Sequence, residues 1–230
     1  MKIFSLSNIK YPAMSVFTTL SLGHSLPLAA PSYKIAAIPD RFEKVVKIQN
    51  PVDKYTQEDL PAVFREAVNP SGWTVNKDTL KMAPSPKIKI MEKDTLASVV
   101  VDITHSILFR YDKQGKVIEA FKAATGAPST PTPVGIAKIV GKLTYPYSTL
   151  PRKCKRRRFP RNYGPKILLT YKINPKTGKL HDDGVYPHGT KFENAIDKGH
   201  ITGGCTRVHN RDILYLSDIL EKGMYVLFTK

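Results

Sequence analysis

Cys205 lies between two glycines and an arginine, in the segment TGGCTR (202–207). A cysteine attacks as its thiolate, so a thiol with an ordinary pKa of about 8.5 needs an imidazole or backbone N–H dipoles nearby. His188 lies seventeen residues earlier, in VYPHGT (185–190), at the end of a predicted strand. The two residue types predict a Cys–His centre that forms an acyl-enzyme, provided that folding brings the side chains together.

Gly203 and Gly204 come immediately before the cysteine, and glycines adopt backbone conformations that other residues avoid. They allow backbone N–H groups to point at a developing oxyanion. We therefore expect Cys205 to attack a carbonyl carbon, while His188 accepts the thiol proton and later returns it. The amides around Gly204 and Cys205 would stabilise the tetrahedral intermediate.

Other interpretations of Cys205 stay open at this point. A disulfide to Cys154, the second of two cysteines, is an alternative in an exported protein. A buried cysteine without chemistry is another. His200 and His209 could join Cys205 at a zinc ion, but the spacings fit no familiar zinc pattern. We expect no metal and no organic cofactor, and a structural role for His209 beside a helix start.

The elements that must position these residues are short. From Ser98 onward, β-branched and aromatic runs alternate with turns, which is typical of antiparallel strands. One clear helix is predicted over residues 210–223, with Asn210 as its cap and Gly223 at its end. The sequence predicts a mainly β domain over 88–230, a sandwich or barrel with a few short helices. The predicted strands cover 98–103, 106–112, 116–125, 134–140, 166–173 and 224–228.

The N-terminal part differs in character. Residues 1–30 carry two lysines, no acidic residue and an apolar run before Ala29 and Ala30, which is the pattern of a signal peptide. The run is short for a bilayer span, so membrane attachment would require an uncleaved N-terminus. Residues 31–87 read as a linker or small module with a short helix near 59–68, and no chemistry is assigned to them.

The charge is lopsided, with 36 Lys and Arg against 19 Asp and Glu, a net charge of +17. Fourteen of the basic residues lie between Glu119 and Asp182, where no acidic residue occurs, and they concentrate in PRKCKRRRFPRN (151–162). This segment is either a solvated loop or a region that attracts an acidic substrate or polyanion. Nucleic acid is disfavoured, because few aromatic residues are interleaved and no nucleic-acid motif follows.

HGT (188–190) followed by TGGCTR resembles the histidine-glycine-threonine and Ser/Thr-x-Gly-Cys-x-Arg signature of the L,D-transpeptidase catalytic domain family. Residues 99–140, which include TGAPSTPTPVG (125–135), look like the opening strands of that family. The resemblance spans about residues 95–229. It implies a β-sandwich catalytic domain exported to the periplasm or cell wall of a bacterium, where it acts on peptidoglycan stem peptides.

The resemblance also implies a mechanism. Family members acylate their cysteine at the L-centre of the third residue of a tetrapeptide stem and expel the terminal D-alanine. A stem amine, an envelope-protein lysine or a free D-amino acid then resolves the thioester, whereas water gives L,D-carboxypeptidase activity. Carried over to this chain, Cys205 is the nucleophile and His188 the general base and acid. The carbonyl of Gly189 orients the imidazole.

The remaining motif positions form the expected substrate-binding or oxyanion set. Thr202 occupies the Ser/Thr place, Gly204 precedes the nucleophile, and Thr190 follows the histidine-glycine pair. Arg207 is the family arginine, which either holds the active-site loop or meets a substrate carboxylate. Gly203 stands where many relatives carry a larger residue, which removes one expected substrate contact.

A second departure from the family is the long basic segment over about 142–184, where relatives carry a lid over the acyl pocket. A rival from another class is a secreted basic protein that binds an anionic polymer through 151–162 while its catalytic centre stays idle.

Overall fold

The computed structural model describes residue 56 and residues 58–65, 77–154 and 158–230. The predicted signal peptide lies outside these residues, as does most of the predicted module 31–87. The helices are α1 (Ala62–Arg65), α2 (Lys77–Lys81), α3 (Asn210–Ile219) and the 3-10 helices η2 (Pro160–Tyr163) and η3 (Glu193–Lys198). The strands are β1 (Lys87–Ile90), β2 (Lys93–Leu96), β3 (Val99–Asp102), β4 (Ile107–Tyr111), β5 (Val117–Gly126), β6 (Gly135–Thr144), β7 (Lys166–Ile173), β8 (Leu180–His181), β9 (Pro187–His188), β10 (His200–Thr202), β11 (Thr206–Val208) and β12 (Tyr225–Thr229).

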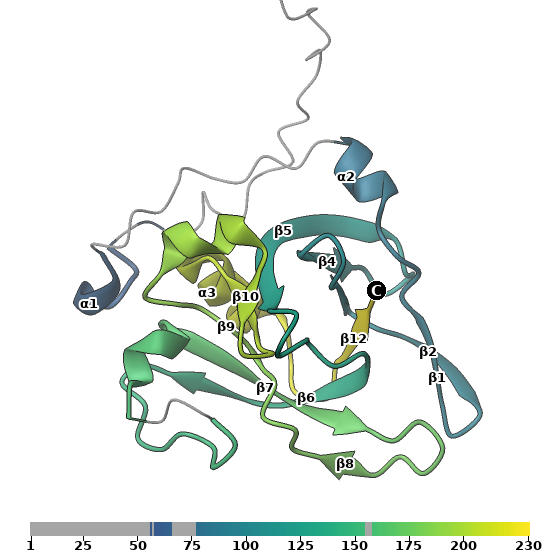
Figure 1. The fold of residues 1–230 in the computed structure, drawn as a ribbon. Coiled ribbons are helices and arrows are strands. Elements are labelled where there is room, and N and C mark those ends of the chain that lie inside the picture. The colour runs from purple at the N-terminus through teal and green to yellow at the C-terminus, as the bar shows by residue number, and fades with distance from the viewer. Residues whose placement is uncertain (1–55, 57, 66–76, 155–157) are drawn as a thin grey trace, which may run out of the picture. The chain divides into compact units, whose positions relative to one another are not determined.

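The main sheet closes on itself. Strand pairing runs β5, β11, β9, β7, β6, β12, β3 and β4, and β4 pairs back to β5, so the strands follow a ring (Figure 1). Strand β10 also pairs with β5, and β8 pairs with β7. The order places the short β9 between β7 and β11, which brings the histidine segment beside the cysteine segment. The predicted mainly β fold is confirmed.

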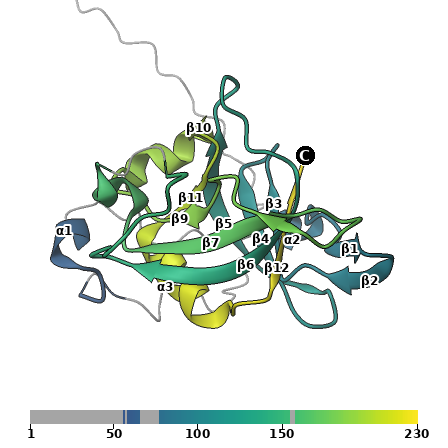
Figure 2. The same cartoon turned by 90° about the horizontal axis from the view of Figure 1, so that it is seen from below.

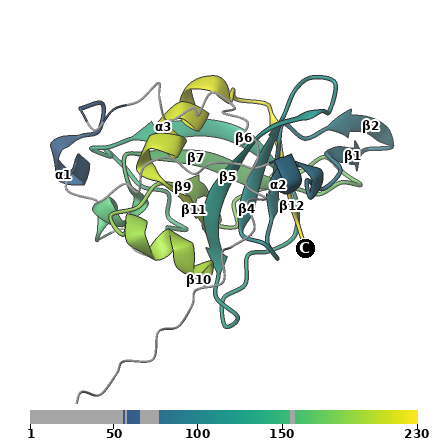
Figure 3. The ribbon, with the colours of Figure 1, turned by 90° about the horizontal axis from the view of Figure 1, so that it is seen from above.

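Both faces of this sheet are buried. Because successive side chains of a strand point to opposite faces, Val99 and Val101 enter one core and Val100 enters another. The first core packs against Ile213, Leu216 and Leu220 at the C-terminal helical segment. Helix α3 lies along β7 and β9, as Figures 2 and 3 show from opposite sides. The β1–β2 hairpin covers the second core with its apolar side chains.

The predicted helix near the C-terminus is present over Asn210–Ile219, but its predicted cap is wrong. The residue at the N-cap position is His209, and no side chain caps this end of the helix. The side-chain oxygen of Asn210 accepts a hydrogen bond from the distant Thr190 N–H instead. A tertiary contact has therefore taken the oxygen that the local pattern assigned to the helix start.

Part of the region assigned to the linker contacts the domain. Leu60 and Phe64 of the α1 segment are buried against Leu214 of α3, beside Tyr145. The β1–β2 hairpin, which begins at Lys87, was not predicted as a hairpin. Among the described residues, no helix has the length and apolar character that crossing a membrane requires.

The contact between α3 and the first core should dominate the stability of the domain. Leu216 is fully buried there, so Leu216→Ala should lower the free energy of unfolding by about 2–5 kcal/mol. Leu180→Ala removes the same atoms from a side chain that is 42% exposed and should change it by less than about 0.5 kcal/mol. Urea denaturation followed by circular dichroism measures both. Equal losses in the two variants would contradict this placement of α3.

Candidate active site

Cys205 lies in a tight turn between β10 and β11. Gly204 has a φ of +115°, in the left-handed region that favours glycine. The hydroxyl oxygen of Thr202 accepts a hydrogen bond from the Gly204 N–H at 3.1 Å and donates to the Cys205 carbonyl at 2.6 Å. The threonine side chain therefore closes the turn that presents the thiol.

The loop between β5 and β6 fastens this turn from outside. The Thr130 hydroxyl donates to the Thr202 carbonyl at 2.8 Å, and the Thr132 hydroxyl donates to the Gly204 carbonyl at 2.9 Å. The Thr132 oxygen also accepts the Gly126 N–H at 2.8 Å. A Cβ atom on Gly126 would lie 2.2 Å from the Thr130 carbonyl oxygen, so the loop folds back only with glycine there. The TGAPSTPTPVG segment thus supports the nucleophile.

His188 is held between two strands. Its Cα pairs with that of Arg207 in the parallel strand β11 and with that of Ile167 in the antiparallel strand β7. The ring is buried, and the ring of Tyr163 meets it edge to face with centroids 4.9 Å apart. Its Nδ1 is hydrogen-bonded to the Gly189 carbonyl oxygen. Because a carbonyl can only accept, Nδ1 carries the proton and Nε2 is the proton acceptor.

The histidine, the cysteine and the arginine line one small cavity of about 50 Å³. The thiol of Cys205 lies 3.6 Å from the Gly184 carbonyl oxygen and donates to it. Three lining residues come from loops that the motif does not cover, and the basic character of the segment before them was the available sign. The full lining is Asn162, Tyr163, Gly184, His188, Gly203, Cys205 and Arg207.

The environment of His188 keeps its imidazole neutral. Burial, followed by the positive charge of Arg207, lowers the pKa of His188 to about 3, although the hydrogen bond to Gly189 acts in the opposite direction. At neutral pH the ring is therefore a neutral base whose tautomer is set by the Gly189 carbonyl. The thiol beside it is the proton donor in the resting arrangement.

Two predicted substrate contacts are corrected by the structure. Thr190 and Thr202 are buried and do not line the cavity. The Thr190 N–H donates to Asn210, and its hydroxyl oxygen accepts the Phe192 N–H at 3.0 Å. Both threonines build the turns that carry the reactive groups. The N–H of Gly204 likewise serves its own turn, by donating to Thr202, and is not directed at an oxyanion.

The other cysteine and histidines turn to different partners. Both cysteines are free thiols, and Cys154 is buried. His200 is hydrogen-bonded to the Thr125 hydroxyl at 2.8 Å, and His209 lies 3.7 Å from a Glu193 carboxylate oxygen. Within the described ranges, no three His, Cys, Asp or Glu side chains gather as a metal site would require.

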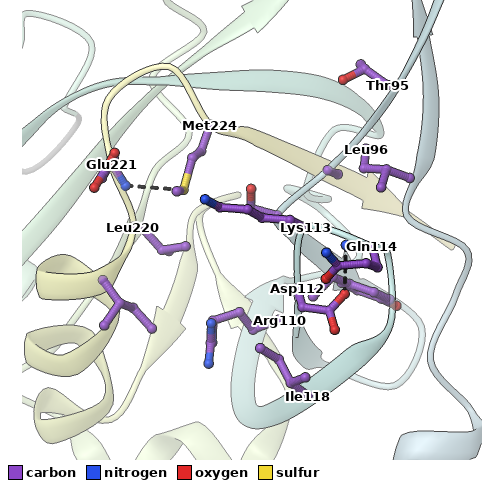
Figure 4. A pocket seen from close by; sticks show the side chains of 14 residues that line it. Thr95, Leu96, Arg110, Asp112, Lys113, Gln114, Ile118, Leu220, Glu221 and Met224 are labelled. Atoms are coloured by element: carbon purple, nitrogen blue, oxygen red, sulfur yellow. Dashed lines mark hydrogen bonds between the residues drawn. The ribbon is translucent and has the colours of Figure 1, made fainter.

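A second cavity, of about 810 Å³, opens between the β4–β5 turn, β2 and the end of α3 (Figure 4). Arg110, Asp112 and Lys113 reach it from the turn, and Leu220 and Met224 face them. Its lining contains no thiol and no imidazole and shares no residue with the smaller cavity. Size alone therefore does not identify the chemical site.

The family model for the L,D-transpeptidase catalytic domain (YkuD) matches residues 97–227, more than half of the chain. The chain belongs to the L,D-transpeptidase catalytic domain family. This family comprises cell-envelope enzymes that act on peptidoglycan stem peptides. A search of curated proteins found no match.

Solved L,D-transpeptidase structures are similar in fold. An L,D-transpeptidase from Mycobacterium smegmatis is 16% identical, covers 64% of this chain and 69% of its own, and gives a TM-score of 0.39. A mutant Enterococcus faecium L,D-transpeptidase is 20% identical, with 58% and 49% covered and a TM-score of 0.40. Bd1075 of Bdellovibrio bacteriovorus is 22% identical, with 64% and 53% covered and a TM-score of 0.45. The chain thus spans about half to seven tenths of these relatives.

The low basicity of His188 can be measured directly. Nitrogen-15 NMR of the imidazole should show a neutral ring with a protonated Nδ1 from about pH 8 down to about pH 5, because the folded pKa lies well below the usual 6.5. The same histidine in the urea-unfolded chain should titrate near 6.5. A folded-state transition between about pH 6 and 7 would show that the ring is solvated or paired with a thiolate.

Proposed function

We propose that this domain is a cysteine acyltransferase that acts on peptidoglycan tetrapeptide stems. Cys205 would attack the carbonyl carbon at the L-centre of the third stem residue, release the terminal D-alanine and pass the acyl group to an amine. One observation carries the proposal: the thiol of Cys205 and the buried, oriented imidazole of His188 line the same cavity. Family membership supports the choice of substrate.

The proton follows the bonds in each half-reaction. As the S–C bond forms, the thiol proton passes to Nε2 of His188. The amide C–N bond then breaks, and His188 gives that proton to the departing amine of D-alanine. In the second half, an acceptor amine attacks the thioester and His188 takes its proton. The S–C bond breaks, and the proton returns to sulfur.

The charge of Arg207 bears on the first step. It contributes to the low pKa of His188, so an imidazolium does not accumulate in the free enzyme. A stem carboxylate beside Arg207 would offset that charge and raise the basicity of the imidazole when substrate arrives. We therefore assign Arg207 to the substrate carboxylate. We assign the oxyanion to the backbone N–H of Cys205, because that of Gly204 donates to Thr202.

The cavity holds a reacting carbonyl and not a whole stem, because ligand pockets usually exceed about 300 Å³. The stem would extend over the surface beside Asn162 and Tyr163. Arg158 and Arg161 are exposed next to these two residues in the chain. We propose that they raise the local concentration of the anionic stem, and that the protein works in the bacterial envelope after export.

Incubation of the purified protein with a defined tetrapeptide muropeptide and a D-amino acid tests the function. Mass spectrometry should show D-alanine exchange or cross-linked dimers. Cys205→Ala and His188→Ala should abolish a thioester adduct while circular dichroism stays unchanged. Tripeptide without exchange would instead indicate a carboxypeptidase. A wild-type protein that forms no adduct but binds polyanions with steep salt dependence would contradict the proposal and favour the binding protein.

The steering role of the basic segment predicts a kinetic signature. Arg158→Glu combined with Arg161→Glu should lower kcat/KM by about tenfold at low salt and leave kcat unchanged, because the change acts on encounter. The loss should shrink as salt screens the charges. Lys176→Glu/Lys179→Glu makes the same charge change on the β7–β8 turn and is the matched control. Equal losses in both double variants would show a net-charge effect rather than local steering.

A further inference from the structure

The peptide group between Gly189 and Thr190 makes a hydrogen bond at each end. Its carbonyl oxygen accepts the Nδ1–H of His188. Its N–H donates to the side-chain oxygen of Asn210 at 2.8 Å. A peptide group is planar, so the carbonyl and the N–H turn together. Whatever holds the Thr190 N–H therefore also sets the direction of the carbonyl that orients His188.

Two glycines leave space for this arrangement. A Cβ atom on Gly189 would lie 2.5 Å from the Asn210 side-chain oxygen. A Cβ atom on Gly164, whose φ is +67°, would lie 2.4 Å from both the Gly189 carbonyl carbon and the Thr190 nitrogen. Both distances are too short for any side chain. The peptide is thus packed against Gly164, with Asn210 as close as the missing Cβ of Gly189 permits.

Asn210 is itself fixed. It is fully buried as the first residue of α3, and its backbone N–H donates to the Glu193 carboxylate. The oxygen of a helix-start asparagine commonly caps its own helix, but here it reaches twenty residues back along the chain. A buried acceptor and a buried N–H satisfy each other, and breaking the pair would leave both unsatisfied.

We propose that Asn210 is a positioning residue that fixes the tautomer of His188 through the Gly189–Thr190 peptide. This inference rests on the proposed role of His188 as the proton acceptor. If the peptide turned over, its N–H would face Nδ1 and select the tautomer protonated on Nε2. That nitrogen could not then accept the proton of Cys205. The Asn210 oxygen opposes the turned state, because it would meet the Gly189 carbonyl oxygen.

The test compares Asn210→Ala with Asn210→Asp, which keeps an acceptor oxygen at the same place. Nitrogen-15 NMR at about pH 7.5 should show a mixture of His188 tautomers in Asn210→Ala, and the Thr190 amide should exchange faster with solvent. Thioester formation should slow by at least about tenfold, the lower range of what a correctly protonated base contributes. Asn210→Asp should retain the single tautomer and most of the rate.

Asn174→Ala is the matched control. The exposed Asn174 side chain also accepts backbone N–H groups, from Lys176 at 2.9 Å and Thr177 at 3.2 Å, but it lies in the β7–β8 turn and outside the cavity lining. This variant should behave as wild type in every measurement.

An unchanged tautomer and rate in Asn210→Ala would overturn the proposal, and so would an Asn210→Asp protein as impaired as Asn210→Ala. If Asn210→Ala does not fold, Gly189→Ala, which crowds the same oxygen, replaces it against Asn210→Asp. The NMR measurements need no substrate. A tautomer change in a protein whose wild type forms no thioester with stems would therefore refute the proposed function and leave this inference standing.

Discussion

The hydrogen bond between the buried imidazole of His188 and the Gly189 carbonyl is the constraint on which the site depends. A buried imidazolium would cost solvation that this pocket does not return, and Arg207 raises the cost further. The ring is therefore neutral, and a neutral imidazole is useful only if its free nitrogen faces the nucleophile. One carbonyl makes that choice by accepting from Nδ1. The position of this carbonyl is consequently more demanding than that of any other backbone group in the pocket.

The fold supports nucleophile and base by separate means and relates them through one strand pair. Threonines of the β5–β6 loop and of β10 hold the cysteine turn through hydroxyl groups that each use a donor and an acceptor. The histidine is held by β7 on one side and by α3 through Asn210 on the other. Pairing of β9 with β11 then fixes the distance between the two assemblies. Each support satisfies buried polar groups, whose loss would cost about 1–3 kcal/mol each.

The sequence predicted the long strands because their apolar alternation extends over many residues, and the joint motif named Cys205, His188 and Gly189. The shortest strands, β9, β10 and β11, have two or three residues and no readable period, so ring closure could not be foreseen. Thr190 and Thr202 were misplaced because a hydroxyl near a nucleophile looks the same in sequence whether it meets substrate or closes a turn. Asn210 matched a local cap, and its actual partner is separated by twenty residues.

The start of α3 shows why a distant asparagine can be positioned so tightly. Glu193, His209 and Asp212 are buried together there. Burial raises the pKa of Asp212 to about 7, whereas hydrogen bonding to Glu193 outweighs burial and raises the pKa of His209. Buried charged groups of this kind often add little net stability, since desolvation consumes most of their attraction. Their geometry is nonetheless strict, because a shift of α3 along its axis would separate charges that have no solvent to replace the lost partner. The cluster therefore contributes register more than stability, and that register carries Asn210 to the peptide beside His188.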